Sequence, residues 1–302
     1  MKNYTYENTS DKDLFRVVDR NGDWIFYWHK PSDKYFRAVN HILEVGFAKG
    51  LRFYEWLKNK SADEAEKILK SAGEKGDRVH KAISLLFRDG KIHRATKVWD
   101  DEKKIEVSLT NDDWDCVLAF QEFWKRHEPA LIVGEQSVYD STLEYAGTLD
   151  AIIVLTKACE IRTCPCKDLV GKKGLFDWKS GGGIYSSYGA QIAAYAKAES
   201  LKEKIDYTAI LRIGTNHKMT GGYEFQVYDL TDTEVHFQEF LAARQIANAE
   251  FKPFDAMKEV IEIPDVIEID LTKIVKSVKA KRKPKKGRVK AKRKTKNATD
   301  KI

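Results

Sequence analysis

The sequence predicts a mixed α/β fold in which helices flank a β-sheet, with a helical extension at the N-terminus. Three observations lead to this prediction. Helical periodicity dominates the first part of the chain, β-rich runs follow between residues 130 and 230, and helical segments separate and close these runs. This order differs from the regular alternation of a Rossmann fold. With 42% hydrophobic residues, a chain of 302 residues can bury one large core.

The N-terminal region, residues 1–75, is predicted to be mainly helical. Within residues 35–58, apolar side chains recur near the helical period, at Val39, Ile42, Leu43, Phe47, Leu51 and Tyr54. Gly46 and Gly50 fall on the same face, where they either weaken the helix or mark a close packing contact. A short charged helix over 63–72 is expected to begin at Ser61, because a serine hydroxyl suits the N-cap.

Residues 76–275 are predicted to form the core of the fold. Amphipathic helices are expected over 76–88 and 112–127. Two β-rich runs separated by a polar stretch then predict a hairpin. The predicted elements from there on are strands over 130–139, 145–155 and 174–179, a helix over 188–200, strands over 207–213 and 223–230, and a helix over 231–251.

The basic charge of the chain gathers in a C-terminal tail, residues 276–302. This segment holds fourteen Lys or Arg and one acid, so it carries +13 while the rest of the chain carries −6. Such a segment cannot fold alone and typically binds a polyanion. We therefore expect nucleic-acid contacts at Lys281, Arg282 and Lys283. The alternatives are a nuclear-localisation signal or a disordered solubilising tail.

The sequence shows neither a membrane span nor an export signal. No apolar run approaches the length needed to cross a bilayer, and the first residues have no signal-peptide core. We therefore expect a protein without membrane association, located in the cytoplasm with the nucleoid or host-cell DNA. Disulfides are not expected in that compartment.

The first candidate for chemistry is the strand ending in Asp177, Trp178 and Lys179. Alternate residues of a strand share a face, so Asp177 and Lys179 project together while Trp178 points away. A carboxylate that holds a divalent cation, next to a lysine that orients the attacking water, suits phosphodiester hydrolysis. The triple glycine at 181–183 would let a substrate approach closely. Two similar acid-x-lysine patterns within 101–104 lie in a polar segment and are interpreted as solvated surface.

A second acid, Asp150, lies among aliphatic residues of an earlier strand. A carboxylate there is costly unless paired or metal-bound, and two acids on neighbouring strands make a site for a hard cation. The alternative is a buried aspartate that caps a turn. Glu135, on the preceding strand, is either a secondary acid near the metal or a surface residue. Gln191 and Tyr195 share one helical face and either contact nucleic acid or form an ordinary surface pair.

Taken in order, these motifs resemble the PD-(D/E)XK nuclease superfamily. The motifs are G-x-x-D at 147–150, D-W-K-S at 177–180 and Q-x-x-x-Y at 191–195. They look like the RecB-like and Cas4-like branch, which includes phage-type exonucleases; Leu149 stands where other members have proline. Upstream, residues 75–83 look like the G-x-x-x-H helix of that branch, and residues 38–43 with Trp56 look like the N-terminal region of its phage members.

The resemblance implies a restriction-endonuclease-like core and a metal-dependent DNA nuclease. By this resemblance His80, Asp150, Asp177 and the Trp178 carbonyl bind Mg²⁺ or Mn²⁺, Lys179 acts on the water, and Ser180, Gln191 and Tyr195 bind DNA. The expected activity is exonucleolytic, on linear or single-stranded DNA ends in recombination, repair or phage replication. The alternatives are an endonuclease of the same superfamily, or a non-catalytic nucleic-acid-binding protein with a vestigial site.

The expected partners are DNA and a separate protein. The chain has no phosphate-binding G-x-x-x-x-G-K-[ST] motif, so it is not expected to hydrolyse ATP. A helicase, or a single-strand-binding or annealing protein, would therefore be a separate polypeptide.

Three cysteines cluster between the two acidic strands. Cys159, Cys164 and Cys166 suggest a Zn²⁺ site, but a closed site needs a fourth ligand, from Cys116 or a histidine. The alternative is reduced loop cysteines. Some relatives bind an iron–sulfur cluster, but they use a cysteine trio after the Q-x-x-x-Y motif, which this chain lacks.

Overall fold

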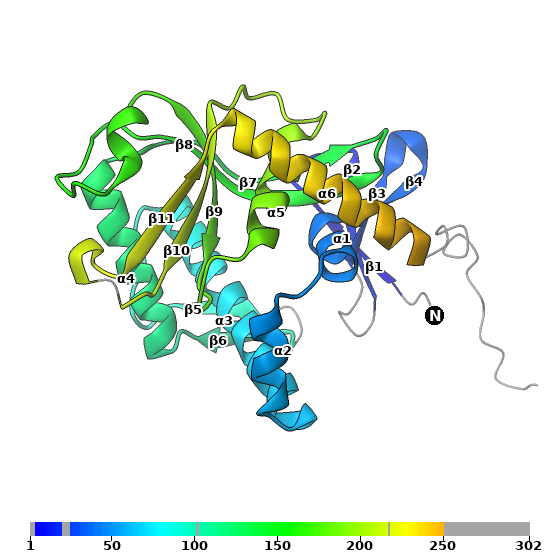
Figure 1. Ribbon diagram of the computed structural model, residues 1–302, viewed down its shortest axis with the longest axis horizontal. Coiled ribbons are helices and arrows are strands. Elements are labelled where there is room, and N and C mark those ends of the chain that lie inside the picture. The colour runs from blue at the N-terminus through cyan, green and yellow to red at the C-terminus, as the bar shows by residue number, and fades with distance from the viewer. Residues whose placement is uncertain (1–3, 20–24, 101–102, 217, 251–302) are drawn as a thin grey trace, which may run out of the picture. The chain divides into compact units, whose positions relative to one another are not determined.

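The computed structural model describes residues 4–19, 25–100, 103–216 and 218–250, which form a mixed α/β fold (Figure 1). Its large mixed sheet has the strand order β1-β2-β3-β4-β8-β9-β10-β11, and β7 pairs with the other edge of β8. The strands are β1 (Tyr4–Asn8), β2 (Leu14–Asp19), β3 (Ile25–His29), β4 (Lys34–Ala38), β7 (Ala130–Asp140), β8 (Tyr145–Val154), β9 (Lys173–Lys179), β10 (Tyr207–Ile213) and β11 (Tyr223–Tyr228). The predicted mixed α/β class is confirmed.

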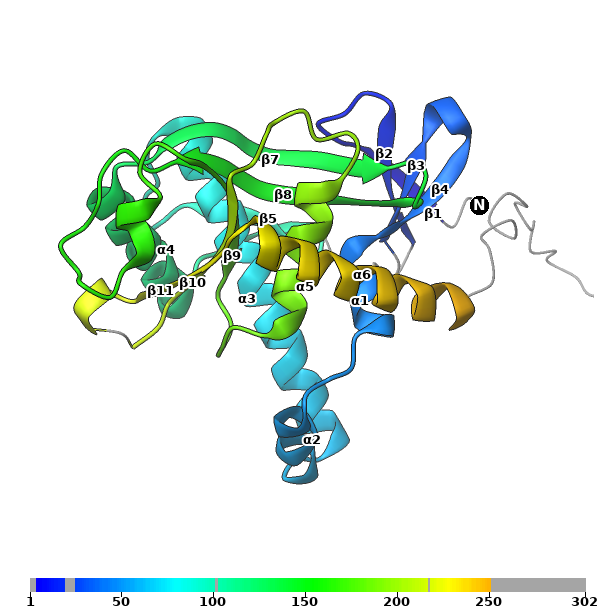
Figure 2. The same ribbon diagram turned by 45° about the horizontal axis from the view of Figure 1, so that its top comes forward.

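Helices cover both faces of the central strands (Figures 1 and 2). On one face α1 (Val39–Gly46) and α5 (Ser186–Lys197) pack with α6 (Leu230–Glu250). On the other face lie α3 (Ala62–Asp89) and α4 (Asn111–His127), next to a small hairpin of β5 (Lys97–Asp100) and β6 (Ile105–Ser108). Of the helices in the described ranges, none is long and apolar enough to cross a membrane.

The expectation of a helical region over residues 1–75 is wrong in its first half. Strands β1 to β4 form an antiparallel meander there, and β4 leads directly into α1. Aromatic residues are buried on both faces of this meander, Tyr27 and Phe36 on one and Phe26 on the other, as β-structure favours. The helical period failed as a guide because the apolar residues of β4 run without a break into those of α1.

Other differences are smaller. The segments predicted as separate helices over 63–72 and 76–88 form the single helix α3, which runs across the predicted boundary at residue 75. Ser61 caps it as expected, accepting a hydrogen bond from the Glu64 N–H. Helix α2 (Leu51–Lys58) is separate from α1. The tail over 276–302, with Lys281, Arg282 and Lys283, lies outside the described residues.

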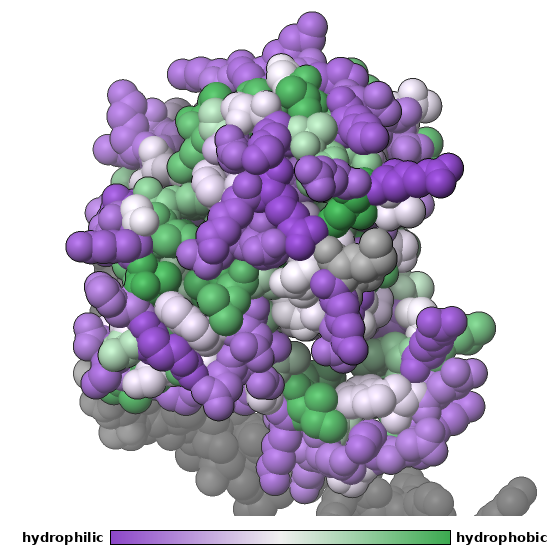
Figure 3. All heavy atoms as spheres, turned by 90° about the vertical axis from the view of Figure 1, so that its left-hand side faces the viewer, coloured by the Kyte–Doolittle hydropathy of each residue, from purple (hydrophilic) through white to green (hydrophobic). Residues whose placement is uncertain are grey.

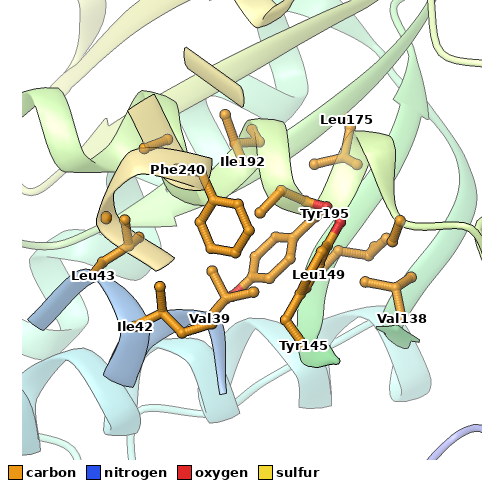
Figure 4. Close-up of a cluster of buried hydrophobic side chains, with 14 of the residues drawn as sticks. Val39, Ile42, Leu43, Val138, Tyr145, Leu149, Leu175, Ile192, Tyr195 and Phe240 are labelled. Carbon is orange, nitrogen blue, oxygen red and sulfur yellow. Dashed lines mark hydrogen bonds between the residues drawn. The ribbon is translucent and has the colours of Figure 1, made fainter. Parts of the chain in front are cut away.

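Two hydrophobic cores lie on opposite faces of the sheet. The first, the α5-side core, contains Leu175 of β9 together with residues of α1, α5 and α6 (Figure 4). The second, the α4-side core, contains Phe176 and Trp178 with residues of α3 and α4. Strand β9 therefore turns Asp177 and Lys179 toward α5, as its alternation predicts. On the outside, hydrophilic side chains cover most of the face shown in Figure 3, with hydrophobic groups scattered between them.

Candidate functional site

The candidate site lies where the sheet opens between β8 and β9. One edge of β8 pairs with β4 at Tyr145 and Ala146, and the same edge begins to pair with β9 only at Ala151, opposite Phe176. Residues 147–150 pair with neither strand on this edge. The opening exposes backbone groups of β9 that a continuous sheet would have used for pairing.

At this opening the Asp150 side chain, rather than the backbone of β8, accepts a hydrogen bond from β9. Its Oδ2 atom accepts a hydrogen bond of 2.7 Å from the Trp178 N–H. Strand β8 is irregular at this point, because Leu149 and Ile152 both belong to the α5-side core although residues three apart in a regular strand face opposite sides. Asp150 is therefore held by the backbone geometry of two strands.

Glu135 lies across from Asp150 in the register of β7 and β8. Its neighbours Gly134 and Gln136 pair with Ala151 and Leu149, and its own φ of 43° is in the left-handed region. Its exposed side chain lines a groove beside α3 rather than joining the contacts of Asp150. The strand pairing thus places the Glu135 backbone opposite Asp150, but the Glu135 side chain lines the groove and does not contact Asp150.

His80 reaches the opening from α3, and its two ring nitrogens meet two partners. Nδ1 lies 3.2 Å from Asp150 Oδ1, and Nε2 donates to the Trp178 carbonyl at 3.0 Å. Burial lowers the pKa of His80, but the neighbouring Asp150 carboxylate outweighs this effect and raises the pKa to about 9. Without a metal the ring is therefore an imidazolium that donates from both nitrogens. The His80 side chain keeps 31% of its surface exposed, so the site is open to solvent.

Asp177 is almost fully buried beside this group, with 2% of its surface exposed. Its Oδ2 atom forms an ion pair with Lys179 Nζ at 2.7 Å. Burial raises the pKa of Asp177 to about 6, and nearby Asp150 adds to the increase, although Lys179 opposes it. The folded chain therefore holds this carboxylate in an environment that disfavours its charge, unless further positive charge is present.

The donor types around the opening are those that hard divalent cations accept. His80, Asp150 and the Trp178 carbonyl are in contact there, and the Asp177 carboxylate is close enough to interact with Asp150 and His80 electrostatically. In the part of the chain that the structure describes, the ligand atoms of His80, Asp150 and Asp177 do not all lie within 4.8 Å of one another. The buried, charge-disfavoured carboxylate of Asp177 points the same way, since a cation would relieve its cost. The residues that would hold the ion are His80, Asp150, Asp177 and Trp178, the last through its carbonyl oxygen.

Lys179 is fixed by a chain of contacts from α5. Its Nζ donates to Gln191 Oε1 at 2.9 Å and lies 4.7 Å from the centre of the Tyr188 ring. Gln191 Nε2 in turn donates to the Tyr195 hydroxyl at 3.2 Å. Gln191 and Tyr195 are buried, which corrects the expectation that they contact nucleic acid directly. Within the described residues, Gln191 contacts Lys179, and Tyr195 contacts Gln191.

The glycine of the G-x-x-D motif makes room for Tyr195. A Cβ atom at Gly147 would lie 2.5 Å from Tyr195 Cε1, closer than packed atoms approach. Figure 4 shows the Tyr195 ring inside the α5-side core, near Leu149 and Tyr145. Gly147 thus links two motifs that lie far apart in the sequence.

Two further residues complete the surroundings. Ser180 is half-buried, and its Oγ lies 3.9 Å from the position that a Cβ of Gly76 would occupy, so the glycine of the G-x-x-x-H segment faces the D-W-K-S strand. Tyr188 was missed by sequence reasoning. Its helical spacing could have identified it, because residues 188, 191 and 195 lie at i, i+3 and i+7 on one helical face.

The three clustered cysteines come together with a histidine. Ligand atoms of His127, Cys159, Cys164 and Cys166 all lie within 4.8 Å of one another, a set able to hold a metal ion. Cys116 packs elsewhere, with its Sγ 3.8 Å from the Ile213 carbonyl. The fourth candidate ligand is therefore a histidine, His127, and not Cys116.

No protein-family model matches the chain, and no curated protein matches its sequence.

Proposed function

We propose that this chain is a divalent-metal-dependent nuclease. The observation that carries the proposal is the contact of His80 with Asp150 and the Trp178 carbonyl at the opening of the sheet, with the ion pair of Asp177 and Lys179 on the same strand beside it. His80 and Trp178 are 98 positions apart in the sequence, so no local pattern forces this arrangement. Together with the motif resemblance, it supports a PD-(D/E)XK nuclease with a restriction-endonuclease-like core.

Each residue has a role in phosphodiester hydrolysis. When bound, the cation supplies positive charge against the phosphate oxygens and the attacking water. His80, Asp150, Asp177 and the Trp178 carbonyl hold it. The Lys179 ammonium orients the attacking water and offsets the negative charge that develops on the phosphate. Gln191 and Tyr195 are positioning residues, because they reach the reacting atoms only through Lys179.

The proposed substrate is DNA. A groove of about 730 Å³ runs beside α3 and is rich in basic side chains, among them Lys81, Arg88, Lys91, His93 and Lys97, with Trp99 available for stacking. His80 precedes Lys81 on the same helix, so a strand in this groove would lie next to the opening. We further propose that the enzyme degrades linear or single-stranded ends, with Ser180 and the basic tail as additional contacts and a helicase or annealing protein as a separate partner.

The activity is tested with labelled linear and circular DNA in Mg²⁺ or Mn²⁺. We expect cleavage by the wild type, faster on linear DNA, and a loss of about 10³-fold or more in Asp150→Asn and Lys179→Ala. Lys60→Ala is the matched control, because Lys60 is ion-paired with Glu64 at the start of α3, about 24 Å along the helix from His80, and it should leave the rate unchanged. DNA binding without cleavage of either form, with the three variants indistinguishable from the wild type, would instead indicate a non-catalytic binding protein.

The positioning of Lys179 gives a second prediction. Gln191→Leu should lower kcat by about 10- to 100-fold with little change in KM, because it releases Lys179 without touching the DNA. Gln191→Glu keeps an acceptor for Lys179 and should retain most of the activity. An equal loss in both variants, or a change in KM alone, would show that Gln191 does not act through Lys179.

A further inference from the structure

The second metal-binding group lies away from the opening, at the connection between β8 and β9. We propose that His127, Cys159, Cys164 and Cys166 hold a structural Zn²⁺ ion. The three cysteines belong to residues 155–172, seen as the green loop beside α4 in Figure 1, and His127 is the last residue of α4. This ion is separate from the proposed Mg²⁺ or Mn²⁺ and does not depend on the nuclease proposal.

The spacing of the four ligand atoms fits one tetrahedral ion. Cys159 Sγ and Cys166 Sγ lie 3.6 Å apart, and zinc–sulfur bonds of about 2.3 Å in a tetrahedron require about 3.8 Å. All four atoms lie within 4.8 Å, so shifts below about 1 Å would close the site. The Cys159 N–H also donates to Cys166 Sγ at 3.3 Å, a contact that would stabilise a thiolate. Four protein ligands leave no open position, as in structural rather than catalytic zinc sites.

His127 provides an independent indication of a ligand. The side chain is fully buried, and its Nε2 is paired with the Tyr223 hydroxyl at 3.0 Å. Its Nδ1 has no hydrogen-bond partner in the part of the chain that the structure describes. A buried nitrogen without a partner is costly, and coordination would remove that cost. The Tyr223 contact fixes the orientation of the ring, as hydrogen-bond partners of metal-binding histidines do.

The site would tie the two acidic strands to α4. Residues 155–172 connect β8, which carries Asp150, to β9, which carries Asp177. On α4, Phe120 packs edge-on against Trp178 with ring centres 5.1 Å apart. Zinc would thus stabilise the packing of α4 against β9 behind the opening without contacting the reacting atoms. An iron–sulfur cluster would spread its ligands further apart than a single ion does, so the close spacing favours zinc.

Metal analysis of the full-length protein, purified without chelators, tests this proposal. We expect one zinc per chain in the wild type and a loss of at least about tenfold in Cys164→Ser and His127→Ala. His127→Cys supplies a thiolate in place of the ring and should retain the metal. Cys116→Ala, which removes a buried thiol outside the cluster, and the double variant Asp150→Asn/Asp177→Asn should both keep one zinc per chain.

Cobalt substitution of the wild type keeps the proposal testable if the ligand variants fail to fold. Bound Co²⁺ should give sulfur-to-metal charge-transfer absorption and the intense visible bands of a tetrahedral site. Thiol titration in denaturant should count four free cysteines, which excludes a disulfide. The proposal is overturned if the wild type contains no zinc and gives no tetrahedral Co²⁺ spectrum, if it contains iron and labile sulfide, or if Cys116→Ala loses the metal as Cys164→Ser does.

Discussion

Asp177→Asn is expected to abolish cleavage and, at the same time, to stabilise the protein in the absence of Mg²⁺ and Mn²⁺. The loss of cleavage, about 10³-fold or more, follows from removing a carboxylate that would hold the cation. The gain in stability follows from burial, which raises the pKa of Asp177 to about 6 in the folded chain. Asparagine imitates the protonated carboxyl that the fold prefers and keeps an oxygen for Lys179.

The pH dependence of this gain has a definite sign. The ordinary pKa of aspartate is 3.8, so between that value and about 6 the unfolded chain releases a proton that the folded chain keeps. The folded state is therefore progressively penalised as pH rises through this window, and the full penalty remains above it. The gain from asparagine should be on the order of 2 to 3 kcal/mol at pH 7.5 and about half of that at pH 5.

Thermal unfolding at the two pH values, in chelator-free buffer without Mg²⁺ or Mn²⁺, measures this gain. Asp115→Asn is a suitable control, because Asp115 is exposed on α4 and should show no comparable stabilisation. If Asp177→Asn were destabilising at pH 7.5, the charged carboxylate would be stabilised in the metal-free fold, and its burial would not indicate a cation site.

Gly147→Ala is expected to damage both the fold and the site. The added methyl group would fall 2.5 Å from Tyr195 Cε1, and the ring is enclosed in the α5-side core. We expect a loss of about 2 to 3 kcal/mol in the free energy of unfolding. Displacement of Tyr195 would also release Gln191 and, through it, Lys179, so cleavage should fall by about 10-fold or more.

A double-mutant cycle separates this contact from a general intolerance of alanine. In a Tyr195→Ala background the space is free, so Gly147→Ala should cost little further stability. Gly73→Ala is the control for a harmless glycine replacement, since nothing lies within 4 Å of its added Cβ on α3. Equal costs of Gly147→Ala in the two backgrounds would show that Tyr195 is not the residue that requires glycine.

Much of the α/β core was predictable because its signals are local. The hairpin of β7 and β8, the short strand β9 and the helices α4 and α5 all have clear periods and breaks. Placing Asp177 and Lys179 on one face of a strand needed only its alternation. The meander of β1 to β4 was missed because its aromatic residues lack a clean alternation and border a true helix.

The finer parts of the site depend on contacts that no spacing encodes. His127 is 32 positions before Cys159 and ends a different element, so the cysteine pattern did not reveal it. The contact of Asp150 with the Trp178 N–H arises because β8 exchanges one neighbouring strand for another at that point. The burial of Gln191 and Tyr195 likewise follows from how α5 packs on the sheet, which a helical face alone does not determine.

The divalent-cation site is tested most directly by anomalous scattering from a crystal soaked in Mn²⁺. We expect a manganese peak at the opening between β8 and β9, within bonding distance of Asp150 and Asp177 and in contact with His80 or the Trp178 carbonyl. The same peak should be absent in Asp177→Asn crystals soaked in the same way. Manganese bound elsewhere with none at the opening, or an unchanged peak in Asp177→Asn, would contradict it.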